Sequence, residues 1–357
     1  MPEYNYHEQA DMQKLNYVDQ IISQMPRYVT QFFRGISQTH APGTRLMYAR
    51  EIQHFFDYII DVSYDKNITS YMDISLDVLS SIDHEFIEDY LYHLQTYKDP
   101  KTGVQRKNGD TTLKRKLCAL SVMYKYLYKH DKVTENPVSK VDMPKIHEKA
   151  IVRMDAAETA IFLDTVEYGN NLSNRQQKFH DKSKVRDLAI MTLMLSTGIR
   201  ISECVGLDLN DVDLDNTSLH IIRKGGKEAI VYFSDEAADA LKEYLKERKK
   251  IDAEKGSEQA LFLSSQRKRL GIRSIEKMVK KYALASVPLK KITPHKLRST
   301  FGTALYNETD DIYLVADVLG HNDVNTTRKH YADMDDYKKR QSRNKVTLRE
   351  SANGKIK

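Results

Sequence analysis

The stretch SLHIIRKGGKEAIVYF, residues 218–233, carries the clearest β-hairpin signal in the chain. Two runs rich in β-branched and aromatic residues flank a Lys-Gly-Gly-Lys turn, where glycine adopts the backbone conformations of a tight hairpin. The segments on both sides repeat apolar residues at helical spacing instead. The pattern predicts a mainly α fold with a small antiparallel β-sheet in its C-terminal domain.

Composition limits the classes of protein. A chain of 357 residues is long enough for about two domains of ordinary size. Its formal charge of +6 is only weak evidence for a polyanionic partner unless the excess is clustered. Two cysteines, Cys118 and Cys204, exclude a disulfide framework and a Cys-rich zinc site. The longest nearly apolar run, residues 188–199, is too short to cross a bilayer, and the polar start is no signal peptide. We therefore expect a cytoplasmic protein with no membrane partner.

The first part of the chain is predicted to be helical. We expect helices at 12–25, 26–37, 44–60, 84–97 and 111–129, with a polar loop before the last. The core stripe of the last helix is predicted to consist of Leu113, Leu117, Leu120, Tyr124 and Leu127. Between Tyr97 and Lys129 nine basic residues stand against two acids, which fits either a nucleic-acid surface or a solvated helix face.

The chain then divides. Residues 135–150 contain two prolines, alternating charge and few apolar side chains, so they are expected to form a linker. Beyond them we expect helices at 154–167 with Asp155 as N-cap, at 185–198, 235–249, 273–284, 294–307 and 311–318, and a polar loop at 170–184. The predicted domains are a helical domain at 1–135, a linker at 136–150, a second domain at 151–335 and a tail at 336–357.

Several charged or ionisable residues interrupt the apolar pattern of the predicted helices in the second domain. Arg200 is followed three residues later by Glu203, so the two side chains can meet on a helix. His295 and Arg298 lie three residues apart, hence on one face, just inside a helix N-terminus, which favours anions. His321 follows a helix-ending glycine. Taken one at a time, each of these residues is better explained as structural.

Together they fit one task, which is the attack of a nucleophile on a phosphodiester. Two guanidiniums can clamp the anionic oxygens without losing their protons. A lysine or imidazole can protonate the departing 5′ oxygen, and a second imidazole can accept the proton of a tyrosine nucleophile. A tyrosyl phosphate keeps the energy of the broken bond, so strands can be resealed without ATP, a metal or another cofactor.

Five segments in this order resemble the tyrosine recombinases, also called the phage integrase family. They are STGIR, the SE that follows it, the RKGGK hairpin, TPHKLRSTF and LGHNDVNTTRKHY, and the similarity, which includes their spacing, is distributed over residues 150–335. The helical first part is similar in character to that family's core-binding domain. The resemblance implies a two-domain DNA clamp that recombines DNA at specific sites through a 3′-phosphotyrosyl intermediate.

The resemblance also implies a role for each matching residue. Arg200 and Arg298 match the two catalytic arginines, and Lys224 matches the lysine that protonates the leaving 5′ hydroxyl, with Lys227 as a nearby competitor. His295 and His321 match the two histidines. The nucleophile would be Tyr331, and Glu203 would support the first arginine.

Two departures from the family pattern are visible. Ser299 stands where many relatives have a second histidine, at a position not usually assigned to chemistry. Ten residues separate His321 from Tyr331, whereas nine are common in the Xer branch, and His330 makes a shift of register conceivable. Tyr331 remains preferred, because the next tyrosine, Tyr337, lies in the charged tail.

Within the family the layout is most like the Xer recombinases of bacteria. It predicts chromosome dimer resolution, with integration or excision of a mobile element as the alternative. The partner is expected to be double-stranded DNA with a specific recombination site, bound by a dimer per site and a homo-tetramer on two sites. Lys114, Arg115 and Lys116 are candidates to reach the major groove. The tail is expected to pack on a neighbouring protomer, or else to be a disordered basic segment.

Two other classes of protein were weighed. A DNA-binding protein without catalysis would have no reason to keep all six catalytic candidates. A metal-dependent phosphodiesterase could use His295, His321 and His330, yet the sequence shows no tight run of Asp and His ligands around them.

Overall fold

The computed structural model describes residues 4–63, 67–98, 102–146, 152–223, 225–321 and 323–324. The chain divides into two compact units, Met1–Lys149 and Ala150–Lys357. Within the described ranges, no helix is both long and apolar enough to span a bilayer.

The first unit is built from helices. Its elements are α1 (Tyr6–Ile22), α2 (Arg27–Gly35), α3 (Pro42–Val62), η1 (Tyr71–Asp73), α4 (Leu76–Ser81), α5 (His84–Gln95), β1 (Thr96–Lys98), β2 (Gln105–Lys107), α6 (Asp110–Lys129) and η2 (Pro137–Lys140). Local signals start several of them: Asn5 and Glu8 form a capping box on α1, and the Asp83 side chain accepts a bond from the N–H of Phe86 on α5.

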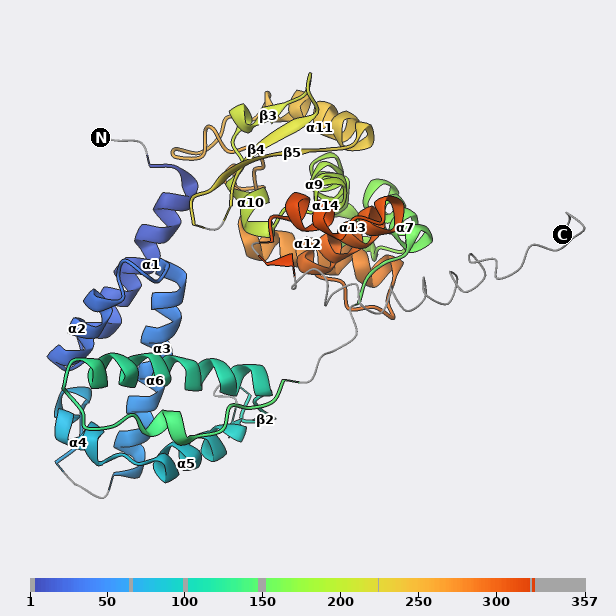
Figure 1. Cartoon of the computed structure of the whole chain (residues 1–357). Coiled ribbons are helices and arrows are strands. Elements are labelled where there is room, and N and C mark those ends of the chain that lie inside the picture. The colour runs from blue at the N-terminus through green and yellow to red at the C-terminus, as the bar shows by residue number, and fades with distance from the viewer. Residues whose placement is uncertain are drawn as a thin grey trace, which may run out of the picture. The chain divides into compact units, whose positions relative to one another are not determined.

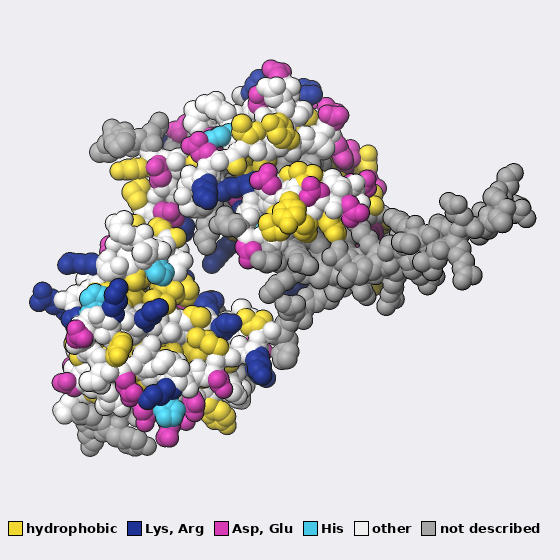
Figure 2. Space-filling model, viewed as in Figure 1, with side chains coloured by type: hydrophobic (Ala, Val, Ile, Leu, Met, Phe, Trp, Pro, Cys, Tyr) yellow, Lys and Arg dark blue, Asp and Glu magenta, His cyan; other side chains and the backbone are white. Residues whose placement is uncertain are grey.

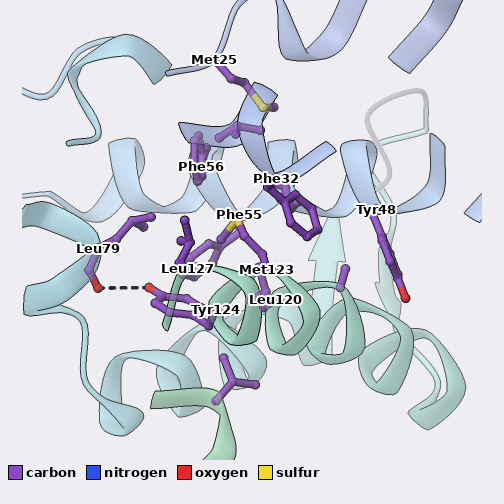
Figure 3. Close-up of a cluster of buried hydrophobic side chains, with 14 of the residues drawn as sticks. Met25, Phe32, Tyr48, Phe55, Phe56, Leu79, Leu120, Met123, Tyr124 and Leu127 are labelled. Carbon is purple, nitrogen blue, oxygen red and sulfur yellow. Dashed lines mark hydrogen bonds between the residues drawn. The ribbon is translucent and has the colours of Figure 1, made fainter. Parts of the chain in front are cut away.

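The core of this unit lies where α3 and α6 pack together (Figure 3). All five residues of the predicted stripe on α6 are buried, which confirms that prediction. Phe55 and Phe56 of α3 and Met123 of α6 are fully buried in the same cluster. The hydroxyl of Tyr124 donates to the carbonyl of Leu79 at 3.2 Å, so this ring is buried without leaving its hydroxyl unpaired.

Two segments of the first unit differ from the sequence-based expectation. The expected polar loop after α5 holds an antiparallel hairpin, β1–β2, whose strand residues are all exposed. Its side chains show no alternation of apolar and polar residues, so no strand signal was available. The expected linker begins with η2, where Val138 and, just after it, Val141 are buried in the helical core. At least residues 137–141 therefore belong to the packed unit.

The second unit combines helices with one sheet. Its elements are α7 (Ala156–Tyr168), α8 (Asn174–His180), α9 (Lys184–Thr197), α10 (Ile201–Gly206), η3 (Leu209–Asp211), β3 (Val212–Asp213), β4 (Ser218–Ile222), β5 (Glu228–Tyr232), α11 (Asp235–Arg248), α12 (Ile272–Ser286), α13 (Pro294–Thr309) and α14 (Ile312–Leu319). Figure 1 shows the sheet at one end of this unit and α12 and α13 toward the other. The buried helix α9 contacts α7, α11 and α13.

The sheet confirms the predicted hairpin. Strands β4 and β5 are antiparallel, with Leu219 opposite Val231, and β3 adds a short third strand. Gly225 and Gly226 both have positive φ, as the Gly-Gly turn requires. The prediction of a mainly helical protein with a small antiparallel sheet in its C-terminal part is correct.

The start of the second unit shows one success and one error. Asp155 caps α7 through a capping box with Glu158, as predicted. The expected polar loop at 170–184 instead contains α8, which starts with a capping box between Ser173 and Gln176. Of the residues in α8 only His180 is buried, so the helix lacks the apolar stripe on which the prediction relied.

Candidate active site

At the C-terminal end of α14, three of the six predicted catalytic residues lie close together: Arg200, Arg298 and His321. Gly320 has a φ of 62°. Its N–H donates to the carbonyl of Asp317 at 2.8 Å, and the N–H of His321 donates to the carbonyl of Ala316 at 2.9 Å. These two bonds form a Schellman motif. A helix leaves its last carbonyls without intrahelical donors, so they are open to donors from elsewhere in the fold.

Three arginines donate to four successive carbonyls at this helix end. Arg223 donates to Asp317 at 3.2 Å and to Val318 at 2.8 Å. Arg298 donates to Leu319, and Arg200 donates to Gly320 at 3.2 Å. The carbonyl end of a helix carries partial negative charge, which attracts cations. The result is a cluster of fixed positive charge directly beside His321.

Arg200 is held by Glu203. Arg200 is the N-cap residue of α10, and its N–H donates to Glu203 Oε2 at 2.7 Å. Its Nη1 donates to Glu203 Oε1 at 2.8 Å. The Glu203 side chain is 3% exposed while that of Arg200 is 34% exposed, so the buried carboxylate fixes a guanidinium that still reaches solvent. The predicted contact between these two residues is present.

Arg298 is buried, unlike Arg200. It lies on α13 and donates from Nη1 to the carbonyl of Gly198 at 2.5 Å, besides its bond to Leu319. Gly198 ends α9 with a φ of 63°. A Cβ at this position would overlap the ring of Phe301 and the side chain of Leu319. Glycine therefore lets the ends of α9 and α14 come close enough for one guanidinium to join them.

The two histidines have different surroundings. His295 is the second residue of α13, after Pro294 at the first helical position, and it is exposed. His321 follows the Schellman motif and is partly buried. His295 and Arg298 lie on one helix three residues apart, as expected, but they do not share one environment: His295 is exposed and Arg298 is buried.

Two predicted catalytic residues lie outside the described residues. These two residues are Lys224 and Tyr331, and His330 lies outside the described residues as well. The competitor Lys227 is exposed, and its carbonyl accepts the N–H of Arg223 at 2.7 Å.

Arg223 was not singled out from the sequence. It precedes Lys224 in the RKGGK segment, but a cation at the end of a strand carries no local sign of a role. Its bonds go to backbone carbonyls 94 and 95 residues away, which the side-chain sequence does not reveal.

Cys204 lies next to this cluster but takes no part in it. Cys204 lies on α10 and is buried. Burial, together with the negative charge of Glu203, raises the pKa of its thiol to about 12. A thiol with that pKa is protonated at neutral pH and is a poor nucleophile.

The predicted DNA-contacting residues on α6 divide into two kinds. Lys116 is buried, and its ammonium contacts Glu51 Oε2 at 2.6 Å, so it is oriented toward α3 and not toward solvent. Arg115 bonds the other oxygen of Glu51 at 2.9 Å but is 50% exposed, and Lys114 is partly exposed. The expectation that Lys116 reaches a groove is therefore wrong for this structure. Glu51, 65 residues earlier, was not visible as its partner.

Comparisons with known proteins decide the family. Residues 154–338 match the phage integrase family. The chain is 37% identical over 331 residues to tyrosine recombinase XerS of Streptococcus uberis, covering 85% of this chain and 90% of that protein. It is 34% identical over 337 residues to tyrosine recombinase XerS of Streptococcus agalactiae, covering 88% and 93%. The chain belongs to the phage integrase family of tyrosine recombinases.

Solved structures share the fold of this tyrosine recombinase. The XerH site-specific recombinase bound to palindromic difH substrate has a TM-score of 0.65 at 19% identity, covering 93% of this chain and 96% of that one. The Tn1549 transposon integrase in complex with circular intermediate DNA has a TM-score of 0.61 at 19% identity, covering 89% and 100%. The family and the fold inferred from the sequence motifs are both confirmed, and the protein is a tyrosine site-specific recombinase.

Proposed function

We propose that this recombinase cuts and rejoins double-stranded DNA through a covalent 3′-phosphotyrosyl intermediate on Tyr331, as a Xer-type enzyme of chromosome dimer resolution. The observation that carries the proposal is the meeting of Arg200 and Arg298 at the adjacent carbonyls of Gly320 and Leu319. Two guanidiniums anchored side by side suit a phosphate whose transition state spreads negative charge over its oxygens. The XerS relatives, matched over about nine tenths of their length, support the biological role.

Each chemical step has a residue in this proposal. The phenolic oxygen of Tyr331 attacks phosphorus and forms the 3′ phosphotyrosyl bond while the bond to the 5′ oxygen breaks. Lys224 gives a proton to that 5′ oxygen, and His295 accepts the phenolic proton. Arg200, Arg298 and His321 stabilise the pentacovalent phosphate. The 5′ hydroxyl of the exchanged strand then attacks phosphorus and releases the tyrosine, so no ATP, metal or other cofactor is needed.

The first unit supplies the DNA-binding surface in this proposal. The exposed hairpin β1–β2 carries Lys98, Arg106 and Lys107, and its described residues include no acid. Lys114 and Arg115 follow on the first turns of α6. Figure 2 shows Lys and Arg side chains on the visible face of this unit, which are suited to phosphate contacts.

The domain and assembly assignments are part of the same proposal. The helical domain at 1–135, together with the packed residues 137–141, serves as the core-binding domain and residues 151–335 as the catalytic domain, and the two close around the duplex. A dimer binds each site and a homo-tetramer joins two sites. The tail at 336–357 packs on a neighbouring protomer. Mass photometry of the chain with a duplex carrying one site should give a mass for two protomers, and synapsed duplexes a mass for four.

A nicked duplex tests the chemistry. The recombination site in this duplex is first selected from a random-sequence pool by binding to the whole chain. A nick beside the cleavage point then traps the covalent adduct, because the short product strand diffuses away. The wild-type chain should form a DNA adduct that resists SDS and persists in EDTA. Tyr331→Phe should form none, whereas the control Tyr337→Phe should form it normally. An adduct with Tyr331→Phe, or its loss in EDTA, would refute the proposal.

A further inference from the structure

Arg223 links the sheet to the helix end that carries the active site. It directly follows β4, and its backbone closes the hairpin: its N–H donates to Lys227 at 2.7 Å, and its carbonyl accepts the N–H of Gly226 at 3.1 Å. Its guanidinium donates to the carbonyls of Asp317 and Val318 on α14. A single side chain therefore spans from the β4–β5 turn to the last turn of α14.

The guanidinium of Arg223 also lies directly against Gly320. A Cβ on Gly320 would overlap Nη1 and Cζ of Arg223, so only hydrogen separates the two. Gly320 is the residue before His321, and its own carbonyl is bonded by Arg200. The short segment from Leu319 to Gly320 is thus held by Arg298 and Arg200 through its carbonyls and covered by Arg223.

We propose that Arg223 is a positioning residue of the recombination reaction: it fixes the last turn of α14 against the hairpin and thereby sets the place of His321 relative to Arg200 and Arg298. The inference rests on the proposed function, because it assigns His321 a part in stabilising the transition state. Arg223 itself need not touch the DNA. A planar fork with donors on two nitrogens can hold two successive carbonyls at once, which an ammonium cannot do with the same geometry.

A purely structural role would have a different signature. Arg248 offers a matched case within the same unit: it is 5% exposed and donates to the carbonyls of Ala260, Glu258 and Ile251. None of those carbonyls belongs to the candidate active site. Arg248→Ala should therefore lower thermal stability and leave the cleavage rate of the folded enzyme unchanged.

The test measures adduct formation in a single turnover on the nicked duplex at saturating protein, with thermal unfolding of each variant. Arg223→Ala should cleave on the order of 10²-fold more slowly than wild type at equal occupancy of DNA, since a displacement of about 1 Å can cost that much. Arg223→Lys, which keeps the charge but not the fork, should be intermediate and serves as the readout if the alanine variant does not fold.

A double-mutant cycle shows whether Arg223 acts through His321. His321→Ala alone should slow cleavage, and adding Arg223→Ala to it should slow cleavage little further, because the positioned group is already gone. Wild-type cleavage rates for Arg223→Ala or Arg223→Lys would overturn the inference. So would a double variant whose rate loss equals the product of the losses of Arg223→Ala and His321→Ala. If the wild-type chain itself forms no adduct, the proposed function fails. If wild type forms adduct and the Arg223 variants form it at the same rate, only the inference about Arg223 fails.

Discussion

Glu203 grips Arg200 at two points, accepting the backbone N–H with one carboxylate oxygen and the guanidinium with the other. The same carboxylate therefore both starts α10 and aims the arginine. Because the Glu203 carboxylate is buried, water cannot replace it as the acceptor. Only a side chain of similar length and charge at position 203 could satisfy both donors.

Replacing Glu203 by alanine should affect both folding and chemistry. Two donors lose their acceptor, so we expect the free energy of unfolding to fall by about 1–3 kcal/mol. Cleavage in the nicked-duplex assay should slow at least tenfold as Arg200 loses its fixed orientation. Glu243→Ala on α11 is the control, because that exposed carboxylate pairs with Lys246 three residues later on the same helix, away from the candidate site. A Glu203→Ala enzyme with a wild-type cleavage rate would show that Arg200 does not depend on this grip.

Gly320 should not tolerate a side chain. Alanine at a φ of 62° costs about 1–2 kcal/mol, and its methyl would push Arg223 away from α14. Gly320→Ala should therefore unfold at a lower urea concentration and form adduct more slowly. Gly271→Ala is a suitable comparison, since Gly271 has a φ of −87° and open space around its Cβ position. Equal rates for the two variants would contradict the close packing of Arg223 on Gly320.

The hairpin β1–β2 should contribute to DNA affinity through charge. Replacing Lys98, Arg106 and Lys107 by glutamine should reduce the slope of log affinity against log salt by about 2–3, since each phosphate contact contributes about 0.9. The measurement is a filter-binding or fluorescence titration at several salt concentrations. The double variant Lys242→Gln, Lys246→Gln on α11, whose lysines pair with acids of their own helix, should leave the slope unchanged. An unchanged slope in the hairpin variant would remove the hairpin from the DNA surface.

Lys116 and Arg115 should behave differently although they are neighbours. Lys116→Gln should lower the free energy of unfolding by on the order of 1–3 kcal/mol, because it weakens a buried bond to Glu51, and should leave the salt slope unchanged. Arg115→Gln should reduce the slope by about 1. Chemical denaturation and the same salt titration separate the two effects. A reduced slope for Lys116→Gln would mean that its ammonium does reach a phosphate.

Cys204 should resist alkylation in the folded protein. With a pKa of about 12, raised by burial and by Glu203, its thiol carries almost no thiolate at pH 8. Cys118 is only partly buried and should react first with iodoacetamide, as peptide mass spectrometry would show. Alkylation of both thiols at equal rates would contradict the enclosure of Cys204.

The sequence predicted the elements that carry their own local signals. The stripe on α6, the Asp155 cap of α7 and the β4–β5 hairpin are local patterns of apolar residues, caps or glycines, and the structure has them all. The capping box of α8 is also local, but the absence of an apolar stripe hid it. The exposed strands β1 and β2 have no such signal at all.

The sequence could indicate candidate site residues but not how they are arranged. Motif spacing indicated Arg200, Arg298 and His321, yet their meeting point consists of backbone carbonyls, which every residue has and no sequence pattern marks. The same reason concealed Arg223. Lys116 was misjudged because its neighbours along α6 are exposed cations, whereas its environment is set by Glu51 on α3.

The use of peptide oxygens at the end of α14 also bears on how this region can evolve. The hydrogen bonds of the Arg223 guanidinium go to the backbone carbonyls of Asp317 and Val318, so these bonds do not depend on which side chains those two positions carry. Side-chain substitutions at these two positions should therefore leave the bonds of Arg223 in place, whereas Gly320, directly before His321, is constrained by both its backbone angle and the neighbouring Arg223. Related enzymes can thus retain an identical anchor beneath a surface that differs from one lineage to the next.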